Sequence, residues 1–144
     1  MGKSLGFLIL GGRKFFFLSI RWHGQSVCEK QMKTLEENYE KFESLNVVPV
    51  GISVDSVPAK KAWAEHMGLK KLRILSDFCP HGEVAKLYGI FREKDEISER
   101  ANILVDEEGK IVFFKVYPIR NFPILMRYSS FCKGENLLYF LFLN

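Results

Sequence analysis

Cys28 is the residue of this sequence best placed to do chemistry. It follows an apolar run at 13–20 and a polar stretch at 21–27, and it opens a segment with a helical pattern. Backbone N–H groups and the helix dipole favour an anion at the first turn of a helix, and the thiolate is the nucleophilic form of cysteine. Arg21 or His23 would add positive charge nearby, whereas Glu29, directly adjacent, opposes a negative charge on Cys28. The placement predicts redox chemistry; the alternative is that Cys28 is a small buried apolar residue.

The other cysteines, Cys79 and Cys132, are few and widely spaced, so no disulfide framework is expected. This usage fits a reducing compartment, and we expect the protein in the cytoplasm. Cys28 and Cys79 with His23 and His81 are the available zinc ligands, but the spacings H-x4-C and C-x-H match no standard zinc site. The sequence therefore predicts neither a metal nor a bound cofactor.

Length and composition indicate one globular domain over residues 1–144, with 47% hydrophobic and 26% charged residues. The net charge of +4 comes from lysines scattered among glutamates, as in 33–43, which indicates a solvated surface and no nucleic-acid face. No apolar run approaches the roughly 20 residues needed to cross a bilayer, so no membrane partner is expected.

The hydrophobic pattern alternates between strands and helices. It predicts strands at 13–20, 47–53, 72–75, 102–105 and 111–117, and helices at 28–45, 56–67 and 83–88. Ser56 is the expected N-cap of the second helix, and Gly68 is its expected C-terminal stop. Early β-α-β units imply parallel strands, and the turn at 106–109 adds an antiparallel hairpin. The expected fold class is α/β, with a thioredoxin-like mixed central sheet flanked by helices.

Two local features qualify this pattern. One apolar stripe predicts a single helix from Cys28 to Leu45, and its members are Met32, Leu35, Tyr39, Phe42 and Leu45. Pro49 is awkward inside the strand at 47–53, because it has no N–H to donate to a sheet.

Six stretches resemble the peroxiredoxin family, of the alkyl hydroperoxide reductase and bacterioferritin-comigratory type. They are VC at 27–28, GISVDS at 51–56, KAWAEHMGL at 61–69, LSD at 75–77, EVAKLYG at 83–89 and RANILVDEEGKI at 100–111. The ends at 1–12 and 118–144 match poorly. The resemblance implies a thioredoxin-like fold and a thiol-dependent peroxidase that reduces hydrogen peroxide or alkyl hydroperoxides.

The resemblance also implies a site. It places the peroxidatic cysteine at Cys28, and it gives Arg100 the role of holding the thiolate and polarising the peroxide bond. The family motif P-x-x-x-T-x-x-C has Arg21 and Gln25 here in place of its proline and threonine. The amide of Gln25 can donate a hydrogen bond in place of the threonine hydroxyl, with a longer reach.

Oxidised Cys28 would become a sulfenic acid that thioredoxin or a small thiol reduces. The family's frequent resolving position, five residues on, is Lys33, and whether Cys79 or Cys132 resolves Cys28 stays open. Family members often dimerise, so a homodimer is compatible with the resemblance. The alternative is a non-catalytic thioredoxin-fold module, for binding or dimerisation, that has lost the proline and threonine of the motif.

Overall fold

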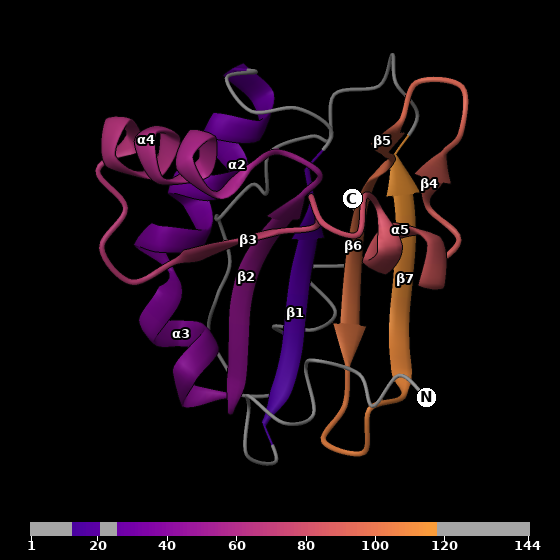
Figure 1. Cartoon of the computed structure of the whole chain (residues 1–144). Coiled ribbons are helices and arrows are strands. Elements are labelled where there is room, and N and C mark those ends of the chain that lie inside the picture. Colours follow the sequence, from indigo (N-terminus) through magenta and orange to yellow (C-terminus); the bar gives the residue numbers. More distant parts are fainter. Residues whose placement is uncertain (1–12, 21–25, 118–144) are drawn as a thin grey trace.

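A computed structural model of the chain describes residues 13–20 and 26–117 (Figure 1). In chain order its elements are β1 (Lys14–Ser19), α2 (Ser26–Glu37), α3 (Tyr39–Ser44), β2 (Val47–Ser53), α4 (Val57–Met67), β3 (Arg73–Ser76), α5 (Glu83–Leu87), β4 (Phe91–Arg92), β5 (Ile97–Ser98), β6 (Arg100–Val105) and β7 (Ile111–Tyr117). The expected ends at 1–12 and 118–144 lie outside the described residues.

Five strands form one mixed sheet in the order β3-β2-β1-β6-β7 (Figure 1). β1 is parallel to β2 and β2 to β3, whereas β6 is antiparallel to both β1 and β7. This confirms the predicted parallel start and the antiparallel hairpin. The small β4–β5 hairpin was not predicted, because two-residue strands leave almost no periodic pattern.

Pro49 lies inside β2 without breaking it. It pairs with Phe16 of β1, while pairing with β3 begins only at Val50. At Pro49, therefore, β2 is flanked by β1 only. Because β3 has not yet begun to pair there, the missing N–H removes no hydrogen bond between β2 and β3.

Each face of the sheet carries its own core. The first core joins α2, α3 and α4 to the strands, and its members include Phe16, Leu18, Cys28, Met32, Phe42, Trp63 and Leu104. The second core packs α5 on the opposite face, and its members include Phe17, Val50, Ile52, Ala85, Ala101, Ile103 and Val105. Figure 1 accordingly shows α5 apart from the group of α2, α3 and α4. The predicted α/β architecture is confirmed.

The predicted single helix at 28–45 is wrong, because the chain breaks it at Asn38. The backbone there has φ −106° and ψ 11°, which separates α2 from α3. The Asn38 side chain donates to the Thr34 carbonyl oxygen at 2.8 Å and accepts from Lys41 Nζ at 3.0 Å. Such bonds between an asparagine side chain and nearby backbone compete with helix continuation.

Other predicted boundaries move slightly. β3 begins and ends one residue later than predicted, β6 begins two residues earlier at Arg100, and α5 ends at Leu87. Ser56 precedes α4 in extended conformation, and Gly68 ends that helix with φ 71°, as the sequence predicted.

Candidate active site at the start of α2

Cys28 is the third residue of α2 and is fully buried in the first core. Its helix lies close to the sheet because Gly51 of β2 has no side chain. A Cβ at Gly51 would lie 2.8 Å from Met32 Sδ and 3.0 Å from Ile20 Cδ1. Any larger residue at Gly51 would therefore force the ends of the Met32 and Ile20 side chains to shift within the core that surrounds Cys28.

Arg100 is the first residue of β6, and the structure brings it to Cys28. Because β6 is antiparallel to β1, with Ser19 opposite Ala101, β6 begins at the sheet edge where β1 ends. The chain leaving β1 leads to α2. Arg100 Nη2 donates to Cys28 Sγ at 3.9 Å, and Arg100 is only 7% exposed. A buried guanidinium thus places a positive charge and an N–H donor directly against the Cys28 sulfur.

The other two residues of the predicted motif, Gln25 and Arg21, lie outside the described residues. Of the three predicted site residues, the structure therefore brings together Cys28 and Arg100.

Glu29, which opposes a thiolate on sequence grounds, is paired within its own helix. Lys33 Nζ donates to Glu29 Oε1 at 2.6 Å. This bond lowers the pKa of Glu29, with His66 and the charge of Lys33 adding to the effect against some desolvation. The Lys33 ammonium, one turn along the helix, thus offsets the charge of the Glu29 carboxylate. This weakens the electrostatic repulsion between Glu29 and a negative charge at Cys28.

A second polar pair joins β6, the strand that carries Arg100, to β7. Asn102 Nδ2 donates to Tyr117 Oη at 3.0 Å, and both side chains are buried. No motif in the sequence marks either residue. The available signal was the alternation of β6, which gives Asn102 the same face as Arg100.

Cys79 lies exposed in the loop between β3 and α5, and no disulfide joins it to Cys28. Asp77 ties this loop to α5, since its carboxylate accepts from the backbone N–H groups of Val84 and Ala85, each at 2.9 Å. Cys132 lies outside the described residues.

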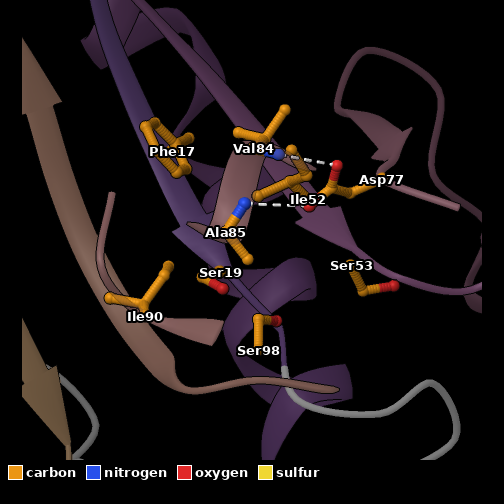
Figure 2. Close-up of a pocket in the computed structure, with 9 residues that line it drawn as sticks. All are labelled: Phe17, Ser19, Ile52, Ser53, Asp77, Val84, Ala85, Ile90 and Ser98. Atoms are coloured by element: carbon orange, nitrogen blue, oxygen red, sulfur yellow. Dashed lines mark hydrogen bonds between the residues drawn. The ribbon is translucent and has the colours of Figure 1, made fainter. Parts of the chain in front are cut away.

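A pocket on the opposite face of the sheet holds none of the predicted site residues (Figure 2). Its walls are second-core side chains with four polar residues among them, namely Ser19, Ser53, Asp77 and Ser98. Asp77 is already occupied by the two α5 N–H groups, drawn as dashed lines in Figure 2. Ser98 donates to the Ile20 carbonyl oxygen at 3.0 Å. The pocket has room for about one water molecule and fits no substrate.

Within residues 13–20 and 26–117, no group of three or more His, Cys, Asp and Glu side chains is arranged to hold a metal ion. The helices in this part of the chain are also too short or too polar to cross a membrane.

Comparison with known proteins gives one consistent result. Residues 10–114 match the model of the AhpC/TSA family. Alkyl hydroperoxide reductase E of Mycobacterium tuberculosis is 36% identical over 87 residues, which cover 60% of this chain and 56% of that protein. Peroxiredoxin 1 of Sulfuracidifex metallicus is 35% identical over 98 residues, covering 65% of this chain and 45% of the relative. The chain thus spans about half the length of these relatives.

Solved structures agree. AhpC of Enterococcus faecalis superposes with a TM-score of 0.70 and 27% identity, covering 76% of this chain and 66% of that structure. A 2-Cys peroxiredoxin of Plasmodium vivax gives a TM-score of 0.67 at 24% identity. The expected thioredoxin-like fold is confirmed.

Proposed function

The chain belongs to the AhpC/TSA family, and from that premise we propose that it is a thiol-dependent peroxidase in which Cys28 reduces hydrogen peroxide or an alkyl hydroperoxide. The observation that carries the proposal is the 3.9 Å approach of Arg100 Nη2 to Cys28 Sγ inside the first core. A Cys28 thiolate held beside the Arg100 guanidinium is a nucleophile, and the same cation stabilises the negative charge that develops on the peroxide oxygens.

In the proposed step, the Cys28 sulfur attacks the terminal oxygen of the hydroperoxide. An S–O bond forms and the O–O bond breaks, which leaves a sulfenic acid and releases an alkoxide or hydroxide. The proton that left the thiol ends on this leaving group, so the products are Cys28 sulfenic acid and an alcohol or water. Arg100 donates to the oxygens as charge develops on them. The amide of Gln25 is proposed as a further donor to the same atoms.

Two molecules of an external thiol complete the cycle. The first condenses with the sulfenic acid to give a mixed disulfide and water, and the second displaces Cys28 as a thiol. Thioredoxin or a small thiol is the proposed reductant, and the cytoplasm, where such thiols are kept reduced, is the proposed location. We further propose that residues 1–144 act as one domain.

The proposal also includes a homodimer joined through β7. In the described sheet β7 is an edge strand, and Ile111, Val112, Phe114 and Val116 are each between 39% and 55% exposed. Phe114 lies opposite Ile103 and Val116 opposite Ala101, so these side chains continue the second core outward. An edge strand with an apolar face fits a second copy of itself.

Stopped-flow measurement of hydrogen peroxide consumption, with sulfenic acid trapping, tests the proposed function. Cys28→Ser should abolish the reaction, and Arg100→Met should slow it by about 100-fold, the usual effect of removing one donor from a charged transition state. Cys79→Ser, a matched change at the exposed cysteine, should leave the formation of sulfenic acid intact. Peroxide consumption that survives Cys28→Ser would show that the site lies elsewhere. A wild-type protein that does not react would favour the non-catalytic binding module.

A further inference from the structure

We propose that Asn102 and Tyr117 form a positioning pair that holds the Arg100 guanidinium against Cys28; the inference rests on the proposed peroxidase function. Neither residue touches sulfur or substrate in this proposal. They act through Arg100, from the strand that carries it and the strand beside it.

The strand register places the three residues on one face of the sheet. Arg100 lies directly opposite Tyr117 on β7, and directly opposed residues share one face with Cβ atoms about 4.5–5.5 Å apart. Asn102 follows Arg100 by two residues on β6, so it projects from the same face. On that face Leu104, the next in the series, belongs to the core that contains Cys28. The three polar side chains thus lie side by side on one face of the sheet, the face whose core contains Cys28.

The Tyr117 ring is held by contacts with two side chains. Its hydroxyl accepts from Asn102 Nδ2 at 3.0 Å, and Lys115 Nζ lies 5.2 Å from its ring centroid. Burial raises the pKa of Tyr117 while the bond from Asn102 lowers it, with a net rise, so the phenol stays neutral at physiological pH. A fixed ring beside the Arg100 stem restricts the rotamers that a long, flexible side chain would otherwise sample.

The burial of Asn102 lowers the stability of the fold. Asn102 is 5% exposed, and its Oδ1 has no hydrogen-bond partner within the described part of the chain. A buried amide with one unpaired polar atom destabilises a fold, and replacing such a pair by apolar groups of the same shape can be neutral or stabilising. The neighbours of Asn102 across the sheet are Leu18 and Lys115, and neither position requires an amide here. The pair is therefore better explained by what it does for Arg100 than by stability.

The test uses Asn102→Leu, Tyr117→Phe and the double variant in the full chain. Three quantities are measured for each: the second-order rate of Cys28 oxidation by hydrogen peroxide, the rate of Cys28 alkylation by iodoacetamide, and the urea midpoint of unfolding. We expect each single variant to lose about tenfold in the oxidation rate, the scale of a modest misplacement of a reacting group. The double variant should lose little more, because its two residues act as one unit.

Alkylation needs the Cys28 thiolate but no polarised O–O bond. Its rate, measured at a pH high enough to ionise Cys28 fully in every variant, should therefore change by less than about twofold. The double variant should unfold at the same urea concentration as wild type or a higher one. Tyr88→Phe is the matched control, since it removes a half-buried hydroxyl on the opposite face, against Phe17. It should leave the oxidation rate unchanged.

Equal losses in oxidation and alkylation, or a lower urea midpoint in the double variant, would show a merely structural pair and overturn the inference. Unchanged oxidation in all three variants, with a reactive wild type, would overturn this inference alone. An unreactive wild type would overturn the proposed function and this inference together.

Discussion

Lys60 brings its amine into the interior between α4 and β3. It is buried on the face of α4 that also carries Trp63 and Met67, and its Nζ donates to the Leu75 carbonyl oxygen. Burial lowers the pKa of Lys60 from 10.5 to about 7, although the charges of Asp55 and Asp77 work to raise it. The spacing of three and seven residues to Trp63 and Met67 was the sequence signal for this inward position.

Stability should therefore depend on the protonation of Lys60. Between pH 7 and 10.5 the unfolded chain keeps the Lys60 proton that the native state has released, so the free energy of unfolding rises with pH. Below about pH 7 both states are protonated and the full penalty of burying the charge applies. The total change is at most about 5 kcal/mol.

Lys60→Met should flatten this rise and increase the free energy of unfolding at neutral pH. Urea unfolding at a series of pH values between 6 and 10.5 measures it, with the difference between variant and wild type removing the contribution of other titrating groups. Lys61→Met, at the exposed neighbouring position, is the control and should keep the wild-type slope. A Lys60→Met protein with an unaltered slope would refute the assignment.

The helix that carries Cys28 is anchored at its far end by Glu36. The Glu36 carboxylate accepts backbone N–H groups from Lys70 and Lys71, each at 3.0 Å, and from Leu72 at 2.7 Å. Burial raises the pKa of Glu36, but these three bonds and the charge of Lys71 outweigh it and bring the pKa below its ordinary value. One side chain thus fastens α2 to the segment that enters β3.

Glu36→Gln should lower the free energy of unfolding by about 1–2 kcal/mol, because bonds from backbone N–H groups to a charged acceptor are lost or weakened. Since the folded pKa is the lower one, the wild-type advantage is present above pH 4.5 and fades as the pH falls through the folded value. Chemical unfolding at pH 7 and at pH 3 measures both effects. Glu37→Gln, one residue on and exposed, should cost little at either pH; a loss as large as that of Glu36→Gln would contradict the anchor.

The strands and most helices could be predicted because each carries a long pattern with clear ends, such as β1 or the stop at Gly68. The break at Asn38 could not, since the apolar stripe continues through it and only the side-chain bonds of Asn38 reveal it. The pairing of Cys28 with Arg100 spans 72 residues of sequence. Family resemblance pointed to it, but no local pattern encodes such a contact. Asn102 and Tyr117 needed the strand register itself.

At the scale of the whole molecule, four of the exposed apolar side chains in the described part of the chain share one edge strand, and they form the β7 stripe of Ile111, Val112, Phe114 and Val116. If two copies pair there, Phe114→Lys should convert the dimer to a monomer, because it places a charge in the apolar centre of the interface. Sedimentation equilibrium over a range of protein concentrations measures the association.

Leu87→Lys is the control for that experiment. Leu87 is a more exposed apolar residue, but it lies on α5 and outside the stripe, so the dimer should persist. A wild-type protein that is monomeric at every concentration would refute the homodimer, and dissociation by Leu87→Lys would show that the interface lies elsewhere.

The strand order also determines the order in which the strands can pair while the chain is synthesised from its N-terminus. β1 is the middle strand, and Phe16 pairs with Pro49 on one side but with Leu104, 88 residues further along, on the other. During synthesis β1, β2 and β3 can therefore assemble as a parallel unit. The second edge of β1, with Phe15–Leu18, stays unpaired until β6 has been synthesised. An unpaired edge with so many apolar side chains can pair with a strand of another chain and so start aggregation. The arrival of β6 covers this edge of β1 and also brings Arg100 to Cys28, so the same pairing step protects the central strand and assembles the site.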